Sequence, residues 1–155
     1  MAARDGDGWI ECSCGSKHWG LNGAAGLLIF KGNEILLQHR APWVHNGDTW
    51  GIPGGARDSH ETLIEGAIRE AIEETGIDPH ELQLLATYID DHGSWSYATI
   101  FAKATENLVA HEVNDESYEV RWIQLADVTR LPLHPSLART WPSLLEILNN
   151  LITPR

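Results

Sequence analysis

Three glutamates lie within five positions near the middle of the chain, in the stretch REAIEETG at residues 69–76. On a helix that turns by about 100° per residue, Glu70, Glu73 and Glu74 project from one face. Glu70 and Glu74 form an (i, i+4) pair of like charges, and the helix dipole disfavours anions in the last turns. Carboxylate oxygens are the ligands that Mg²⁺ and Mn²⁺ prefer, so a bound divalent cation would offset both penalties. The pattern predicts a metal site, with a plain solvated acidic face as the alternative.

The helix that carries these glutamates has clear ends in the sequence. Thr62 followed by Glu65 forms a capping box before an apolar-periodic run. Gly76 stands where a C′ glycine belongs, and Pro79 prevents an easy continuation of the helix. These signals predict a helix over residues 63–75.

The opposite face of this helix is predicted to pack into the core, because isoleucines and small residues lie there, at about 100° to 200° from Glu70. These residues are Ile64, Ile68, Ile72, Ala71 and Thr75. Arg69 lies about 100° away from Glu70 on the other side, so we expect no Lys or Arg of this helix on the acidic face. The lack of a protein cation there strengthens the prediction of a bound metal ion.

The stretch from Gly55 to Ile77, GARDSHETLIEGAIREAIEETGI, resembles the signature of the Nudix hydrolases. That signature is G-x5-E-x7-R-E-U-x-E-E-x-G-U, where U is a bulky aliphatic residue. The matching positions are Gly55, Glu61, Arg69, Glu70, Glu73, Glu74, Gly76 and Ile77. The first U position holds Ala71, which is smaller than usual and affects local packing only.

The resemblance implies an α/β fold: a Nudix-type α/β/α sandwich with a mixed β-sheet and a catalytic loop-helix-loop. We expect a single domain over residues 1–155, with a core of about residues 20–150. The implied activity is hydrolysis of a diphosphate linkage in a nucleoside diphosphate or triphosphate derivative.

The resemblance also implies roles for the signature residues. Glu70, Glu73 and Glu74 should ligate the cofactor, Mg²⁺ or Mn²⁺, and the Gly54 carbonyl can add a ligand. Glu61 and Arg69 should pair to brace the loop, and Glu61 can help to hold a second metal ion.

The general base is left open between two sources. The resemblance implies either a signature glutamate or an acid in a loop before a late strand, which here is the stretch HEVNDESYEVRW at residues 111–122. Glu116 and Glu119 lie closest to that strand, and the alternative is that they simply flank it.

Residues outside the signature should choose the substrate. At the mouth of the site we expect Arg40, Trp43, His45, Trp50, His92, Trp95 and Tyr97. Aromatic rings can stack on a nucleobase, although most tryptophans of a small domain pack in its core or rim. The wider pattern, with LLQHRAPW and WGIPGG, looks like the MutT-type enzymes.

The MutT-type resemblance implies hydrolysis of oxidised purine nucleotides such as 8-oxo-dGTP to the monophosphate and pyrophosphate. One alternative is an ADP-ribose or other nucleotide-sugar pyrophosphatase. Another is a catalytically inactive Nudix-fold binding domain, against which the intact glutamates argue.

Composition narrows the class of partner. The chain has 155 residues, of which 43% are apolar, which suits one domain and argues against global disorder. A net charge of −11 argues against a groove for a nucleic acid polymer but not against a small nucleotide held through metal ions. The apolar runs are too short to span a membrane, and the N-terminus lacks the apolar stretch of a signal peptide. We expect a cytoplasmic protein, and a homodimer is compatible with the sequence.

Two cysteines lie close together near the N-terminus, in ECSCGSKHW. Cys12, Cys14 and His18 could form part of a zinc site, but no second cysteine pair follows to complete four ligands. The pattern therefore favours two reduced thiols on a strand or loop.

Apolar runs and turn residues predict the remaining elements. Strands are expected over residues 23–30, 34–40, 82–90, 95–104 and 118–125, a short helix in LADVTRL at 125–131, and a C-terminal helix over 142–151 that starts near Pro142. Residues 43–60 are rich in Gly, Pro, Asn and Asp and are predicted to form a long functional loop.

Overall fold

The computed structural model describes residues 4–113 and 117–153. Its strands are β1 (Trp9–Glu11), β2 (Lys17–Trp19), β3 (Ala24–Lys31), β4 (Glu34–Arg40), β5 (Trp50–Gly51), β6 (Gly54–Ala56), β7 (Leu82–Asp91), β8 (Ser96–Ala104) and β9 (Ser117–Gln124). Its helices are α1 (Leu63–Thr75), α2 (Pro135–Ile152) and the short 3-10 helices η1 (Pro79–Glu81) and η2 (Leu125–Arg130).

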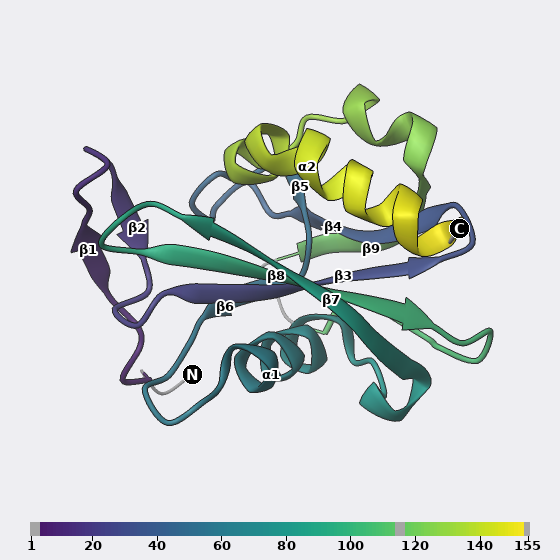
Figure 1. The fold of residues 1–155 in the computed structure, drawn as a ribbon, viewed down its shortest axis with the longest axis horizontal. Coiled ribbons are helices and arrows are strands. Elements are labelled where there is room, and N and C mark those ends of the chain that lie inside the picture. Colours follow the sequence, from purple (N-terminus) through teal and green to yellow (C-terminus); the bar gives the residue numbers. More distant parts are fainter. Residues whose placement is uncertain (1–3, 114–116, 154–155) are drawn as a thin grey trace.

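A seven-stranded sheet forms the middle layer, with α1 on one face and α2 with η2 on the other (Figure 1). The sheet is mixed, because β3 and β8 run parallel whereas its other strand pairs run antiparallel. A separate hairpin of β1 and β2 stands at one end of the sheet. This arrangement confirms the predicted α/β/α sandwich with a mixed sheet.

The strands β3 and β4 pair only beside the turn that joins them, at Phe30–Ile35 and Lys31–Glu34. Further along, β6 pairs with β3 from Ala24 to Gly26, and β5 pairs with β4 at Gln38 and His39. The two strands therefore separate beyond the turn. The strands β5 and β6, which belong to the loop of residues 43–60, pair with the edges of β4 and β3 that this separation exposes.

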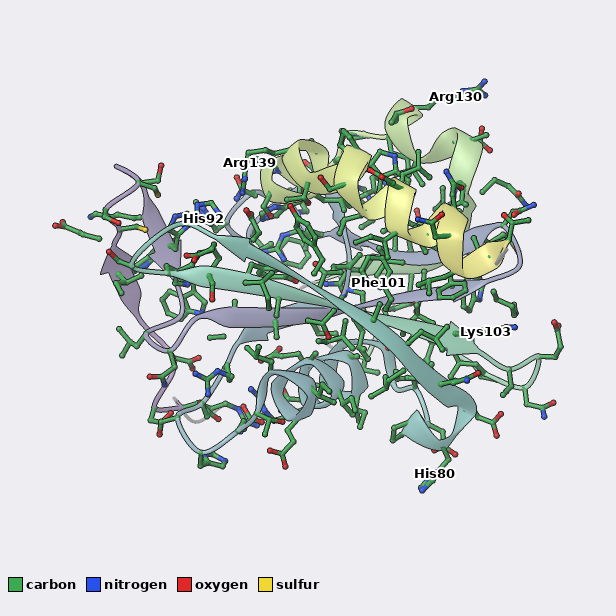
Figure 2. The ribbon with its side chains drawn as sticks, viewed as in Figure 1. His80, His92, Phe101, Lys103, Arg130 and Arg139 are labelled. Carbon is green, nitrogen blue, oxygen red and sulfur yellow. The ribbon has the colours of Figure 1, made fainter. Side chains whose placement is uncertain are left out.

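The core has two parts, one on each face of the sheet. Along β3 the side chains alternate: Leu27 and Ile29 pack on the α1 side, and Leu28 and Phe30 pack on the α2 side. Phe101 of β8 lies fully buried in the second part (Figure 2). A strand covered on both faces reads as a continuous apolar run, which explains the stretch AAGLLIF.

The predicted strands and the signature helix agree with the structure, the strand ends within one residue. For α1, Thr62 and Glu65 make the capping box, and Gly76 ends the helix with a φ of 67° in the left-handed region. Only glycine adopts this conformation without a Cβ penalty.

The predicted core face of α1 is only partly correct: Ala71 and Thr75 are fully buried and Ile68 packs against the core, but the other two isoleucines are not buried. Ile64 and Ile72 are 41% and 39% exposed, whereas Ala67 and Ala71 are fully buried. The small residues face the sheet because α1 packs closely against β3 and β6. This rotation turns Glu74, only 5% exposed, toward the interior. The smaller Ala71 at the first aliphatic position of the signature fits this close packing.

The C-terminal helix begins at Pro135 rather than near Pro142, so that predicted boundary is also wrong. Pro135 occupies the first turn, and the His134 side chain accepts a hydrogen bond from the Ser136 N–H as the N-cap. Pro142 lies inside the helix. The helix tolerates this proline because a buried apolar row packs against the sheet on both sides of it. The row consists of Leu137, Trp141, Leu144 and Leu148.

Four short strands were not expected. The loop over residues 43–60 contains β5 and β6, and the hairpin β1–β2 precedes the sheet. Strands of two or three residues carry too little periodicity to be read from sequence. None of the helices in the described residues is long and apolar enough to cross a membrane.

Candidate active site

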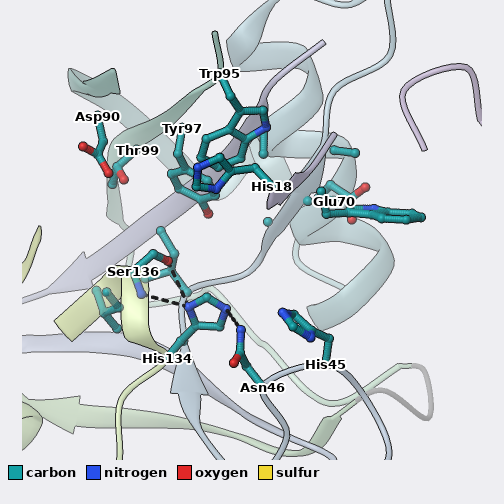
Figure 3. A pocket seen from close by; sticks show the side chains of 18 of the residues that line it. His18, His45, Asn46, Glu70, Asp90, Trp95, Tyr97, Thr99, His134 and Ser136 are labelled. Carbon is teal, nitrogen blue, oxygen red and sulfur yellow. Dashed lines mark hydrogen bonds between the residues drawn. The ribbon is translucent and has the colours of Figure 1, made fainter. Parts of the chain in front are cut away.

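A cavity of about 580 Å³ opens where β3 and β4 separate. Its walls come from the β1–β2 hairpin, β6, the glutamate face of α1, the β7–β8 end of the sheet and the start of α2 (Figure 3). Three of the four signature glutamates line it, namely Glu70, Glu73 and Glu74. The prediction that these side chains share one face is confirmed, and that face looks into a cavity.

Glu70 lies directly against the backbone of Gly55. A Cβ at residue 55 would stand 2.6 Å from the Glu70 carboxyl carbon, so only glycine allows this approach. Burial raises the pKa of Glu70 above its usual value, and the Arg69 guanidinium at 2.9 Å offsets only part of this effect. A carboxylate that is costly to ionise gains from any further cation placed beside it.

Glu74 is the most buried of the three. Its Oε2 accepts hydrogen bonds from the Gly54 N–H at 2.9 Å and from the Gln38 side-chain amide at 3.3 Å. Gln38 itself is buried on β4. The carboxylate is thus fixed between α1, β6 and β4, where the strands separate.

Glu73 is flanked by two arginines, which corrects the expectation of no protein cation near the acidic face. Arg4, from the N-terminal segment, donates to Glu73 Oε1 at 2.6 Å, and Arg69 lies 3.4 Å from Glu73 Oε2. The position of Arg69 around the helix axis does point away from the acidic face, but its long side chain reaches around the helix to Glu73. Arg4 is distant in sequence and could not be placed from helix periodicity.

Arg69 and Glu61 pair as the resemblance implied. Arg69 donates from Nε to Glu61 Oε2 at 2.6 Å and from NH2 to Oε1 at 2.9 Å, a bidentate contact. NH2 also donates to the Ala56 carbonyl at 3.0 Å. Hydrogen bonds from Arg69 hold the pKa of Glu61 below its usual value. One side chain therefore ties the loop between β6 and α1 to the helix.

The donor set fits a hard divalent cation, because three carboxylates and the backbone at Gly54 meet at one wall of the cavity. The oxygens of Glu70, Glu73 and Glu74 do not gather within 4.8 Å of one another, since each is held by a protein partner. A cation there would compete with Arg4 and Arg69 for these oxygens.

The structure describes only one of the two acids named as candidate bases. Glu116 lies outside the described residues. Glu119 sits on β9, where its Oε2 accepts from Arg121 at 2.7 Å, and it is not among the residues that line the cavity. Glu70 and Glu73 do line it.

Most of the expected substrate residues line the cavity: Arg40, His45, His92, Trp95 and Tyr97. Two do not. Trp43 is 63% exposed outside the cavity, and Trp50 is buried in the α2-side core, where it stacks on His39 at 4.8 Å. Trp50 belongs to a β5 strand that the sequence did not reveal, which explains its inward placement.

The sequence missed one wall of the cavity, which the N-terminal hairpin supplies. Trp9, His18 and Trp19 line it, and the His18 ring stacks on Trp95 with centroids 4.2 Å apart and planes 8° apart. The only sequence signal was the concentration of Trp and His in residues 9–19.

The start of α2 supplies another missed group. His134 Nδ1 accepts from the Ser136 N–H, and the Asn46 side-chain amide lies 3.3 Å from Nε2 (Figure 3). Burial, with the nearby charges of Arg40 and His45, lowers the pKa of His134 to about 4. The imidazole is therefore neutral near pH 7.

Arg139 and Asp90 join α2 to β7 at the cavity rim. Arg139 NH2 lies 2.5 Å from Asp90 Oδ2, and His92 Nε2 lies 2.9 Å from the same oxygen. Figure 2 shows Arg139 and His92 side by side.

Tyr97 crosses the floor of the cavity close to two glycines. A Cβ at Gly26 would stand 2.1 Å from the Tyr97 hydroxyl oxygen, and one at Gly54 would stand 2.6 Å from it. Burial and the charges of Glu74 and Glu70 raise the pKa of Tyr97, so its hydroxyl stays protonated.

Comparisons with known proteins agree with this geometry. The NUDIX domain family model matches residues 20–144. A Mycobacterium tuberculosis protein named "Putative 8-oxo-dGTP diphosphatase 3" is 45% identical over 151 residues, covering 90% of this chain and 69% of that protein.

A "Nucleoside triphosphate pyrophosphatase/Nudix hydrolase fusion protein" of Bifidobacterium longum is 41% identical over 157 residues; the match covers 96% of this chain but only 33% of the fusion protein. The crystal structure of a Nudix hydrolase from M. smegmatis, RenU, superposes with a TM-score of 0.87 at 40% identity, covering 97% of this chain and 99% of that one. The chain therefore belongs to the Nudix hydrolase family.

Proposed function

We propose that this Nudix hydrolase acts on oxidised purine nucleoside triphosphates, such as 8-oxo-dGTP, and releases the monophosphate and pyrophosphate. The observation that carries the proposal is the shared cavity: the signature glutamates form one wall, and Trp95 with His18 forms another. These two walls match the two parts of a nucleotide: a wall of carboxylates that binds cations suits the charged phosphate chain, and a wall of aromatic rings suits the flat base. The mycobacterial relative of 45% identity, whose name gives 8-oxo-dGTP as its substrate, supports the same substrate class.

Glu70, Glu73 and Glu74 would hold Mg²⁺ or Mn²⁺, with the Gly54 carbonyl as a further ligand. A bound divalent cation neutralises phosphate charge and lowers the pKa of bound water. Glu61 stays on Arg69 as the brace of the loop and is a candidate ligand for a second cation.

The chain's own cations would bind the phosphates. Arg4, Lys17, Arg40 and Arg139 all line the cavity. Arg4 bonds Glu73 in the structure, and a cation at the glutamates would release its guanidinium toward an anionic substrate. The net charge of −11 is then no obstacle, because these four side chains lie in the cavity and bound divalent cations would offset its acids, which are Asp7, Glu70, Glu73, Glu74 and Asp90.

Trp95 offers both a stacking surface and a donor. Its indole N–H is buried and has no hydrogen-bond partner among the described residues. A buried donor without an acceptor costs about 1–3 kcal/mol, which a carbonyl on a bound base would recover. Guanine carries one carbonyl oxygen and oxidation at C8 adds a second, so this donor is compatible with an oxidised purine base.

His134 and Asn46 provide a second polar contact for the base edge. The neutral imidazole and the amide lie 3.3 Å apart at the cavity wall. Asn46 has a φ of 55°, a conformation that few non-glycine residues adopt and that functional sites often retain. We assign both residues to orienting the substrate.

The proton of the attacking water goes to a carboxylate. Glu70 and Glu73 face the cavity, and we place the general base among these signature glutamates. Glu116 and Glu119 remain the alternatives, so their Gln variants belong in the same experiment.

Product identification tests the proposal. The purified protein is incubated with Mg²⁺ and, separately, with 8-oxo-dGTP, dGTP, ADP-ribose and a dinucleoside polyphosphate. The proposal predicts the highest kcat/KM for 8-oxo-dGTP, with pyrophosphate as product. AMP released preferentially from ADP-ribose would instead assign the nucleotide-sugar alternative, and the absence of turnover on all of them would leave a binding domain.

Substitutions connect that activity to the site. Glu73→Gln keeps the shape of the side chain and removes its charge, so turnover should fall about a hundredfold or more. The exposed Glu106→Gln is the matched control and should keep full activity. A Glu119→Gln variant with normal kcat would support a base within the signature.

A further inference from the structure

The N-terminal hairpin places two thiols and an imidazole together. Cys12, Cys14 and His18 each present one ligand atom, and these three atoms all lie within 4.8 Å of one another. The hairpin precedes residues 20–144, which the family model matches, so the cluster lies outside the matched part of the chain. Neither the glutamate wall nor the proposed chemistry uses these sulfur atoms.

The distances suit a tetrahedral metal centre. Cys14 Sγ lies 3.2 Å from His18 Nε2. With Zn–S near 2.3 Å and Zn–N near 2.0–2.1 Å, a tetrahedral zinc ion would hold sulfur and nitrogen roughly 3.6 Å apart. The Cys14 and His18 ligand atoms therefore need to move apart by only a few tenths of an ångström, and the Cys12 sulfur lies within 4.8 Å of both. Thiolate and imidazole are the donors that zinc prefers over magnesium.

The backbone already holds the three ligands in place. Cys12 N–H donates to the Ser16 carbonyl at 3.0 Å, and Gly15 N–H donates to the Cys12 carbonyl at 3.0 Å. Gly15 has a φ of 92°, so a tight turn reverses the chain directly after Cys14. The hairpin register then sets Ile10 opposite His18 and brings the imidazole back to the thiols.

The tip of the hairpin is also anchored to the turn between β7 and β8. Ser13 N–H donates to Ser94 Oγ at 3.2 Å, and the Cys12 thiol donates to the His92 carbonyl at 3.1 Å. A Cβ at Gly93 would stand 2.4 Å from Ser13 Oγ, which shows how closely the two turns approach. A hairpin fixed at its tip loses little further freedom when it binds a metal ion.

His18 joins this cluster to the substrate cavity. One edge of its ring faces Cys14, and its flat face stacks on Trp95. The His92 ring meets it edge-on with centroids 4.5 Å apart. A metal ion on the hairpin would therefore fix the ring that backs the proposed base-stacking surface.

We propose that Cys12, Cys14 and His18 form a zinc site, separate from the Mg²⁺ or Mn²⁺ site at the glutamates. Each thiol loses its proton to solvent as its sulfur binds the ion, and the Cys12 thiol gives up its bond to the His92 carbonyl. The three side chains occupy three tetrahedral positions, and water occupies the fourth, on the side of the exposed Cys14. The site ties the hairpin into one rigid wall of the cavity.

Metal analysis tests the proposal on the full chain, purified without a histidine tag and without chelator. We expect about one zinc ion per chain in the wild type and in Ser16→Ala, a control in the same turn. Cys12→Ser and Cys14→Ser should each lose the ion, and the pocket-side variant His18→Ala should hold it more weakly.

Cobalt spectroscopy gives a second readout that does not depend on activity. Co²⁺ added to the metal-free protein should give thiolate-to-cobalt charge-transfer absorption. The absorption should persist in Glu73→Gln, which alters the glutamate site, and vanish in Cys14→Ser. Unchanged metal content in Cys14→Ser, wild-type protein without zinc and without cobalt–thiolate bands, or a Cys12–Cys14 disulfide in the protein as purified would each overturn the proposal.

Discussion

Arg69 holds the Glu61 carboxylate with two nitrogen atoms at once, Nε at 2.6 Å and NH2 at 2.9 Å. The same guanidinium reaches the Ala56 carbonyl and the carboxylates of Glu70 and Glu73. It is therefore the physical link between the loop before α1 and the glutamate face. Lysine, with one nitrogen on a flexible stem, cannot make these contacts together.

Arg69→Lys should destabilise the protein by about 2 kcal/mol, because Glu61 would keep only one partially buried contact. Turnover should fall as well, since Glu70 and Glu73 would lose their shared partner. Urea denaturation measures the first effect and steady-state kinetics the second. Arg130→Lys, on an exposed pair with Asp127, is the control and should change stability by less than about 0.5 kcal/mol. Equal effects of the two substitutions would argue against the bracing role.

Gly55→Ala should lower turnover by displacing Glu70, because the new Cβ would stand 2.6 Å from its carboxyl carbon. Gly66→Ala makes the same chemical change one turn before Glu70, where a Cβ would come no closer than 3.3 Å to the Arg57 side chain and 3.6 Å to Glu61 Oε1. That control should keep its activity, and its stability should hold or rise, since alanine favours a helix over glycine. The affinity for Mn²⁺, measured by titration with electron paramagnetic resonance, distinguishes the Gly55→Ala variant from the Gly66→Ala control. Normal Mn²⁺ affinity in Gly55→Ala would contradict the argument.

The stability of the protein should fall as the pH falls from about 6.5 to about 4, through the titration of His134. Its folded-state pKa is lowered to about 4, so in this window the unfolded chain binds a proton that the folded protein does not. The contribution is at most about 3 kcal/mol, present above pH 6.5 and lost by pH 4. Urea denaturation at several pH values measures it.

The matched control for this pH effect is another histidine. His134→Gln should flatten the dependence of unfolding free energy on pH in this window. His80→Gln should leave it unchanged, because that side chain is 92% exposed and points away from the protein (Figure 2). The same slope in His134→Gln as in wild type would assign the acid sensitivity to other groups.

Trp95→Ala should raise the KM for a purine nucleotide roughly tenfold and leave kcat within a few-fold, because base stacking contributes to binding. Trp43→Ala should leave both constants near wild type, since Trp43 lies outside the cavity. The two residues were equivalent from sequence, so this pair separates the sequence prediction from the structural one. A larger rise in KM for Trp43→Ala would show that the loop of residues 43–60 closes over the substrate.

The sequence predicted α1 and its glutamate face well because both are local. Capping at Thr62, the left-handed Gly76 and the angular spacing of the glutamates depend on neighbours within a few residues. The buried face of α1 depends on what packs against it. Ile64 and Ile72 have the right type for a core but stay exposed, whereas Ala71, which was predicted to be buried, and Ala67, which was not, allow the closest approach to the sheet.

The cavity could be predicted only in part, because its walls come from segments far apart in the chain. Arg40, His45, Trp95 and Tyr97 lie beside turns that the sequence marks. Arg4, His18 and His134 are brought in by an N-terminal hairpin and by a helix that begins before its expected start. No periodicity within the chain encodes such contacts.

The most direct test of the central claim is product analysis of 8-oxo-dGTP hydrolysis by ³¹P nuclear magnetic resonance, with and without Mg²⁺. We expect 8-oxo-dGMP and pyrophosphate in the presence of Mg²⁺, no reaction without a divalent cation, and loss of the reaction in Glu73→Gln. Hydrolysis that continues without divalent cations, or that Glu73→Gln leaves intact, would contradict it.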